Sequence, residues 1–137
     1  MTVKAQIKAY LESHSEPKGS DLLLLHSLIL KERPKCKLWF LDGKDSKGKI
    51  VSNPNIGYGS YTITYADGST KEFFQIGLSA NTTGISVYIM GLEDKTYLPK
   101  TYAKKIGKAT VTGYCIKFRK VEDIDLGVLR EVVTITK

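Results

Sequence analysis

The sequence predicts a single α+β domain in which helices from both ends of the chain pack on one face of an antiparallel sheet. Three observations predict this class. Apolar residues recur at helical spacing near both ends of the chain, apolar and polar residues alternate through its middle, and tight turns separate the alternating segments. Hairpin-connected strands set apart from the helices are typical of α+β folds rather than of parallel, doubly wound sheets.

The first expected helix spans residues 3–12, because apolar residues fall at the i, i+4, i+7 and i+8 positions of one helical face. Residues 13–19 are polar, contain a proline and end in glycine, so they form a connector. Ser20 is then the expected N-cap of a second, largely buried helix, and Pro34 ends that helix.

The first expected strand covers residues 37–41, and residues 44–55 after it form the expected mobile loop. Three further strands follow as a meander, over residues 60–65, 70–80 and 85–90. The Asp-Gly and Asn-Thr-Thr-Gly turns between these strands are short enough for hairpins, so neighbouring strands are expected to pair antiparallel.

The last third of the chain is expected to return to the same sheet and end in a helix. Residues 96–107 can form a short helix, and residues 114–118 alternate as a strand does. Either Asp123 or Asp125 is the expected N-cap of the final helix, which carries apolar residues at helical spacing.

Alternation along the strands divides their side chains between two faces. One set is almost entirely large and apolar and is expected to pack on the helices: Tyr61, Ile63, Tyr65, Phe74, Ile76, Leu78, Ile85, Val87, Ile89, Tyr114, Ile116 and Phe118. The other set is mixed and is expected to face the other way: Ser60, Thr62, Thr64, Phe73, Gln75, Ser79, Ser86, Tyr88, Met90, Cys115, Lys117 and Arg119. The mixed face is either an ordinary solvated surface or a binding surface with apolar and charged contacts.

Length and composition are those of a folded domain. The 137 residues suffice to bury a core without disulfides or metals, so we expect one domain over residues 1–137 that needs no cofactor to fold. Cys36 and Cys115 lie on separate expected strands, which favours two reduced thiols in a cytosolic protein. The sequence has no apolar stretch of the kind found in signal peptides or membrane spans, so we expect a cytoplasmic protein that makes no membrane contact.

No motif in the sequence supports catalysis. His14 and His26 lie on different expected elements, and no metal-binding pair or nucleophile elbow is present. Residues 57–62 begin like a dinucleotide-binding fingerprint but lead into a strand, and residues 107–110 lack the upstream glycine of a phosphate loop. A binding or interaction module without catalysis is therefore the leading expectation, ahead of an enzyme acting on a small anionic substrate.

The net charge of +7 favours an anionic partner, although the charge is spread along the chain as on an ordinary solvated surface. The expected partner is an anionic small molecule or a protein, with nucleic acid as a third class. We place any ligand around Lys108, Tyr88 and the strand of Cys115 and Lys117, together with Tyr58, whose flanking glycines let a guest approach the backbone. The alternative is that these residues have structural roles only.

Three segments carry a resemblance to a known family. Residues 107–129 resemble the C-terminal signature of the YdhG-like family, a bacterial domain of unknown function, through Gly107-Lys108, residues 115–119, residues 123–126 and Leu129. Residues 55–61, residues 77–90 and the opening residues 3–11 are similar to its other segments. The resemblance covers nearly the whole chain and implies a single YdhG-like domain with a frataxin-like fold.

The resemblance also implies an alternative function, since one family member is described as an intracellular iron chaperone that delivers iron for iron–sulfur and haem assembly. Frataxin-type iron binding relies on an acidic ridge along the first helix and first strand. Here Glu12, Glu16 and Asp21 are the candidate ligands, and they stand among many lysines. Because iron prefers clustered carboxylates, we expect no tight stoichiometric iron site.

Overall fold

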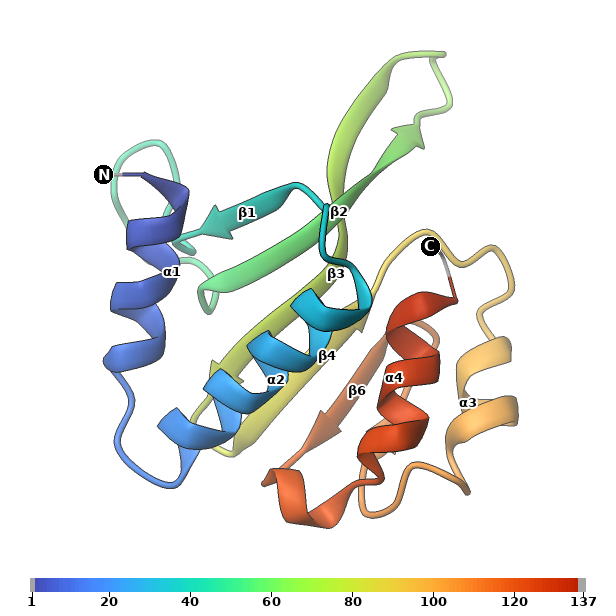
Figure 1. Cartoon of the computed structure of the whole chain (residues 1–137). Coiled ribbons are helices and arrows are strands. Elements are labelled where there is room, and N and C mark those ends of the chain that lie inside the picture. The colour runs from blue at the N-terminus through green and yellow to red at the C-terminus, as the bar shows by residue number, and fades with distance from the viewer. Residues whose placement is uncertain (1, 136–137) are drawn as a thin grey trace.

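Six strands form one antiparallel sheet in the computed structural model, which describes residues 2–135, and four helices accompany it within that range (Figure 1). The strand order is β1-β2-β3-β4-β6-β5. The strands are β1 (Leu38–Leu41), β2 (Asn55–Thr64), β3 (Thr70–Asn81), β4 (Gly84–Ile89), β5 (Thr110–Val111) and β6 (Cys115–Phe118). The helices are α1 (Val3–Glu12), α2 (Lys18–Glu32), α3 (Tyr97–Tyr102) and α4 (Leu126–Thr134), with a 3-10 turn at Val121–Asp123. The predicted α+β class is confirmed.

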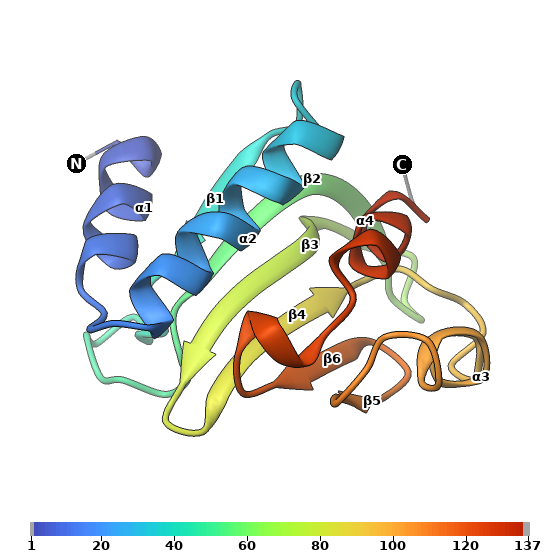
Figure 2. The ribbon, with the colours of Figure 1, turned by 60° about the horizontal axis from the view of Figure 1, so that its bottom comes forward.

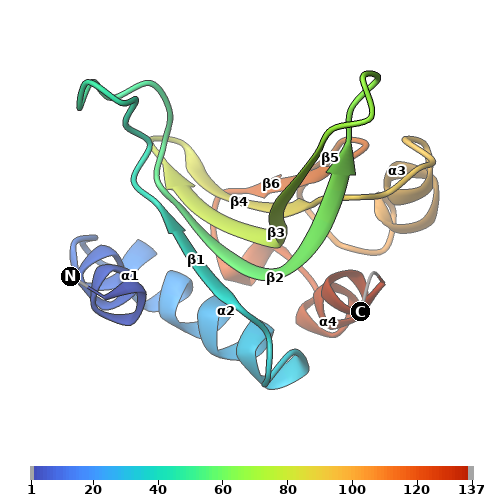
Figure 3. The ribbon, with the colours of Figure 1, turned by 90° about the horizontal axis from the view of Figure 1, so that it is seen from above.

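The helices from the two ends of the chain lie on the same side of the sheet. Figure 2 shows α2 and α4 next to each other over the middle of the sheet, and α1 lies beside β1 at its edge. Figure 3 shows the opposite face without a helix over it, with the β1–β2 loop and the β2–β3 hairpin rising at its two sides. We call this second face the open face.

The core lies between α2, α4 and the sheet. Three strand residues from the predicted apolar set, Ile76, Val87 and Ile116, are fully buried in it. Leu22, Leu25 and Ile29 of α2 and Leu129, Val132 and Val133 of α4 pack against them from above. Burial of these side chains is the main favourable contribution to folding, and it confirms that these three strand residues face the helices.

Two helix boundaries differ from the prediction. Helix α2 begins at Lys18, so Ser20 lies inside its first turn, and the Glu16 carboxylate accepts a hydrogen bond from the Ser20 amide at 2.9 Å. The cap is thus supplied by Glu16 instead of Ser20. Helix α3 covers only Tyr97–Tyr102, and the predicted continuation to residue 107 is wrong. At the final helix the open alternative is resolved, since Asp125 Oδ1 accepts from the Val128 amide at 3.1 Å.

Phe74 is on the opposite face from the predicted one. The regular pairing of β2 with β3 joins Tyr58 to Ile76 and Ser60 to Phe74, but it omits the intervening pair at Gly59, whose φ is +76°. This local distortion breaks the alternation, so the Phe74 side chain lies on the open face against Gly57. Its exposed fraction is only 4%.

Four other residues of the predicted apolar set are less buried than expected. Tyr61, Ile63 and Tyr65 belong to the β2–β3 hairpin, which extends past the helices in Figure 1, so no helix covers them. Tyr114 precedes β6 and is 50% exposed. Alternation assigns a side chain to a face of the strand, but burial also requires an element packed on that face.

Candidate functional site

Five aromatic side chains gather on the open face and form what we call the aromatic surface: Trp39, Phe73, Phe74, Tyr88 and Tyr114. The centroids of the Trp39 and Phe73 rings lie 6.4 Å apart, and those of Phe73 and Phe74 lie 4.2 Å apart. Tyr88 and Tyr114 stack nearly parallel, with centroids 6.3 Å apart and an interplanar angle of 15°. These aromatic residues come from β1, β3, β4 and the residue before β6, so the surface crosses most of the sheet.

Two paired glycines form a flat floor within this surface. Gly57 of β2 lies opposite Gly77 of β3, and Gly77 lies opposite Tyr88 of β4. A Cβ atom at Gly57 would come within 2.6 Å of the Phe74 Cβ, and one at Gly77 within 2.7 Å of the Phe74 ring. The absence of side chains at both positions therefore lets the Phe74 ring lie close to the backbone.

The aromatic rings are only partly covered. Trp39, Phe73 and Tyr88 are half-buried, while Phe74 is buried beneath them. A hollow of about 260 Å³ separates Phe73 and Tyr88 from the loop before β2. The buried Oδ1 of Asn55 in this hollow has no hydrogen-bond partner within residues 2–135. A buried acceptor of this kind needs a donor from water or a ligand.

Lysines flank the aromatic surface. Lys37 Nζ lies 4.1 Å from the Trp39 ring centroid, and Lys71 Nζ lies 5.7 Å from the Phe73 ring centroid, which are cation–π distances. Lys117 is exposed on β6, directly opposite Ser86 of the neighbouring strand. Within the described part of the chain, none of these three lysines forms a salt bridge. Their positive charges are therefore free to meet an anionic ligand.

The structure brings together three of the five residues predicted to bind a ligand. Tyr88 is the cross-strand partner of Cys115, and Lys117 lies two residues further along β6 on the same face. Cys115 is only 1% exposed, and burial raises the pKa of its thiol, although Lys117 and Ser86 lower it in part. Cys115 is thus a protonated thiol beneath the surface and lacks the thiolate character of a reactive cysteine.

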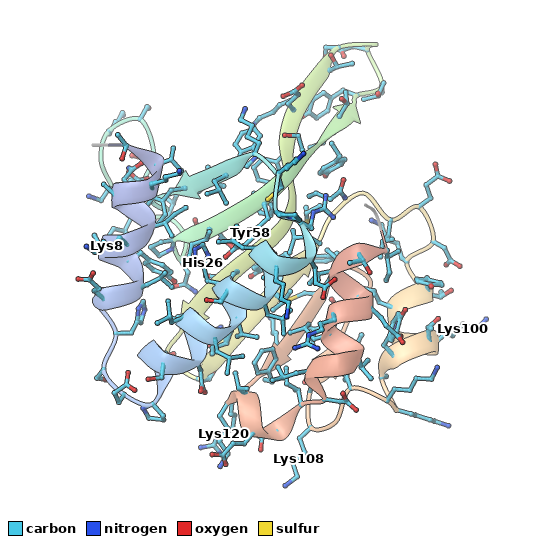
Figure 4. The ribbon with its side chains drawn as sticks, in the orientation of Figure 1. Lys8, His26, Tyr58, Lys100, Lys108 and Lys120 are labelled. Atoms are coloured by element: carbon cyan, nitrogen blue, oxygen red, sulfur yellow. The ribbon has the colours of Figure 1, made fainter. Side chains whose placement is uncertain are left out.

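The other two predicted residues lie elsewhere. Tyr58 is fully buried on the helix side of the sheet, where its hydroxyl lies 2.7 Å from Nδ1 of His26. Lys108 lies in the turn after α3, at the lower edge of the molecule in Figure 4, and its amide donates to the Asp123 carbonyl at 2.8 Å. Neither residue is next to Tyr88, so the five residues do not form one site.

The sequence pattern predicts only part of the aromatic surface. Alternation places Phe73 and Tyr88 on the correct face, but it puts Phe74 and Tyr114 in the core and assigns Trp39 to no face. One signal was present in the sequence: Lys37 and Lys71 each stand two residues before an aromatic residue on a strand, a spacing that puts a cation and a ring on the same face. These two lysine–aromatic pairs form one surface only if their strands lie near each other in the sheet, and local sequence patterns do not give the strand order.

The candidate iron ligands are not brought together. Glu12 is exposed and lies 3.9 Å from Lys8, Glu16 caps α2, and Asp21 Oδ2 accepts from the Val121 amide at 3.1 Å. Residues 2–135 contain no group of three or more His, Cys, Asp or Glu side chains placed to hold a metal ion. These carboxylates therefore do not fit an iron site. The expectation that the protein has no tight iron site stays a prediction.

Comparison with protein-family models, curated proteins and solved structures found no match to this chain. The resemblance to the YdhG-like family, with its frataxin-like fold, therefore stays a prediction. Across residues 2–135, no helix combines the length and the apolar character needed to cross a membrane.

Proposed function

We propose that this protein is a non-catalytic binding module that holds single-stranded nucleic acid on the aromatic surface. One observation carries the proposal: within residues 2–135, half-buried aromatic rings lie on a sheet face that no helix covers, beside lysines that form no salt bridge. Aromatic side chains that stack on bases, combined with cations that meet the phosphates, are the features that bind single strands without strong sequence preference.

The arrangement of the rings suits a short run of bases. Trp39 with Phe73 and Tyr88 with Tyr114 form two aromatic pairs, and the Gly57–Gly77 floor lies between them. Four steps of about 4.8 Å from β1 to β6 give the surface a width of about 19 Å, enough for a few nucleotides. Bases would stack on the two pairs while the backbone runs past the lysines.

The class of ligand follows from the same chemistry. Each base has an apolar face that stacks on an aromatic ring and each nucleotide has a negative charge, and both are needed to use this surface fully. A duplex hides its base faces, so it could engage only the lysines. A protein partner would contact the aromatic rings without requiring Lys37, Lys71 and Lys117 to be unpaired.

Fluorescence anisotropy with a labelled single-stranded oligonucleotide of about ten nucleotides tests the proposal, because that length covers a typical single-strand site. Tyr88→Ala should weaken binding by about five- to a hundredfold, which corresponds to the loss of one stacked base. Tyr97→Ala is the matched control, since Tyr97 is 37% exposed on α3, away from the open face. Its affinity should stay that of the unaltered protein.

The lysines have a similar matched pair. Lys117→Ala should weaken binding and reduce the dependence of affinity on salt by about one counterion, whereas Lys108→Ala should change neither. The proposal is wrong if the protein does not bind the single strand at low salt, or if it binds duplex as tightly. Equal effects of Tyr88→Ala and Tyr97→Ala would place binding away from the aromatic surface.

A further inference from the structure

A groove of about 650 Å³ lies between α1 and α2, on the side of the sheet opposite the aromatic surface. Its apolar lining includes Ile7 and Leu11 of α1, Leu23 and Leu30 of α2, and Leu38 of β1. Sites that hold small molecules commonly have volumes of about 300 to 1,000 Å³ and mainly apolar walls. The groove therefore has the size and lining of a small-molecule site.

Two imidazole rings interrupt the apolar lining, and one of them, His14, has its Nδ1 2.9 Å from the Tyr10 carbonyl oxygen. His26 of α2 lines the groove, and Figure 4 shows it between α1 and α2 with Tyr58 beside it. The Tyr58 hydroxyl lies 2.7 Å from His26 Nδ1, and it has no other hydrogen-bond partner in the described range. Burial raises the pKa of Tyr58 well above its ordinary value, so the hydroxyl stays protonated. Because Nδ1 is the one acceptor among the described residues in reach of this buried O–H, the hydroxyl donates the hydrogen bond and Nδ1 accepts it.

This hydrogen bond fixes the state of the imidazole. Burial lowers the pKa of His26, which favours the neutral ring, and a neutral ring that accepts at Nδ1 carries its hydrogen on Nε2. Across residues 2–135, His26 Nε2 makes no hydrogen bond. The groove thus contains an oriented N–H donor that no protein group uses.

The charged residues around the groove balance one another. Lys4 and Lys8 contribute two positive charges, while Glu12 and Glu16 contribute two negative ones. Lys8 and Glu12 lie 3.9 Å apart, and Glu16 is already bound to the start of α2. The two lysines and two glutamates therefore sum to zero charge and His26 is neutral, so these five side chains give the groove no electrostatic preference for a charged ligand.

We infer that this groove binds a small, uncharged, mostly apolar molecule that presents a carbonyl oxygen to His26 Nε2–H. The apolar walls would cover the body of the ligand, and the Tyr58–His26 pair would orient its single acceptor. The site is separate from the aromatic surface and does not depend on nucleic-acid binding.

The test uses octan-2-one as the probe, with octanoate as its charged counterpart, in a titration followed by two-dimensional ¹⁵N–¹H NMR of the full chain. Octan-2-one should produce saturable shifts in α1 and α2 at millimolar concentration, and octanoate should bind more weakly. Ring ¹⁵N shifts should report the Nε2–H tautomer of His26 in the free protein and a perturbed Nε2 signal in the complex.

Two neighbouring leucines give a matched pair of variants. Leu23 is 54% exposed and lines the groove, whereas Leu24 is 42% exposed and does not line it. Because both side chains are exposed at the surface, neither substitution should unfold the protein. Leu23→Gln should weaken octan-2-one binding by about three- to tenfold through lost apolar contact, and Leu24→Gln should leave it unchanged.

His26→Phe should weaken octan-2-one binding by about three- to tenfold, the effect of losing one hydrogen bond between uncharged groups. Absence of saturable binding, or equal affinity in Leu23→Gln and Leu24→Gln, would overturn the site. Tighter binding of octanoate than of octan-2-one would overturn the ligand class. An Nδ1–H tautomer of His26 would overturn the assigned role of the imidazole.

Discussion

The glycine floor of the aromatic surface makes a quantitative prediction about stability. A Cβ atom at Gly57 would lie 2.6 Å from the Phe74 Cβ and 2.8 Å from the Trp39 Cβ. Ordinary contacts between carbon atoms are about 3.5 Å or more, so these neighbours would have to retreat by about 0.7 to 0.9 Å. Both are Cβ atoms fixed to the backbone of adjacent strands, so the strain cannot be relieved by turning a side chain.

Gly57→Ala should therefore reach the upper end of the range for overpacked sites and lower the free energy of unfolding by about 3 kcal/mol. Gly77→Ala should cost about 1 kcal/mol, because its closest neighbour is Cε1 of the Phe74 ring, at 2.7 Å, and a ring can shift. Urea unfolding followed by circular dichroism measures both values without relying on the Trp39 fluorescence that these changes would disturb.

Gly127→Ala is the control for this comparison. Gly127 is exposed in the first turn of α4, and only the Asp125 carboxylate comes near its added Cβ, at 3.2 Å. The same substitution should there be neutral or should stabilise the protein by up to about 1 kcal/mol, because alanine favours helix over glycine. If Gly57→Ala costs no more than Gly127→Ala, the close packing of Phe74 and Trp39 over the floor is wrong.

Three further predictions concern single side chains. Tyr58→Phe should lower the free energy of unfolding by about 1 kcal/mol in urea titrations, because it removes the hydrogen bond to His26, and an unchanged stability would contradict that bond. Cys115 should react with iodoacetamide far more slowly than the half-exposed Cys36, since Cys115 is 1% exposed and burial raises its pKa; peptide mass spectrometry of a time course would reveal the reverse order. Asp125→Ala should cost about 1 kcal/mol through loss of the α4 cap, and Asp123→Ala, at a residue that does not cap α4, should cost clearly less in the same unfolding assay.

Much of the fold followed from local patterns. Alternation correctly assigned Ile76, Val87 and Ile116 to the core, because β4, β6 and most of β3 pair regularly with their neighbours. It failed at Phe74, where the positive φ of Gly59 accompanies an omitted pair and disturbs the alternation. A glycine signals that such a conformation is allowed, but pairing with the adjacent strand decides whether it is used.

The candidate site was less accessible from sequence than the fold. Tyr88, Cys115 and Lys117 could be placed on one face because two adjacent strands carry them. Trp39 joins the same surface only because β1 takes the edge next to β2, and no local pattern specifies that order. Tyr58 was interpreted as a binding residue near flexible glycines, but its partner His26 lies 32 residues earlier on a helix.

The two proposed sites meet at a single strand. Within β2, Gly57 faces the aromatic surface, and the adjacent Tyr58 points to the other side and supports His26. Residues 57–62, which begin like a dinucleotide-binding fingerprint in the sequence, thus belong to a strand that contributes to a different proposed site on each of its faces. The lack of a side chain at Gly59 also lets Arg33 pack against β2, because a Cβ there would come within 2.6 Å of the Arg33 guanidinium.

Because a whole sheet layer separates the sites, we expect their ligands to bind independently. Leu23→Gln should leave the affinity for single-stranded oligonucleotide unchanged, and Tyr88→Ala should leave the affinity for octan-2-one unchanged, since neither residue contributes to the other site. Saturating one ligand while titrating the other measures the coupling directly, by anisotropy and by NMR. If one ligand changes the affinity of the other by more than about fivefold, the coupling exceeds about 1 kcal/mol. In that case β2 would have to adopt two arrangements, and the single packing of Phe74 against Gly57 and Gly77 would be wrong.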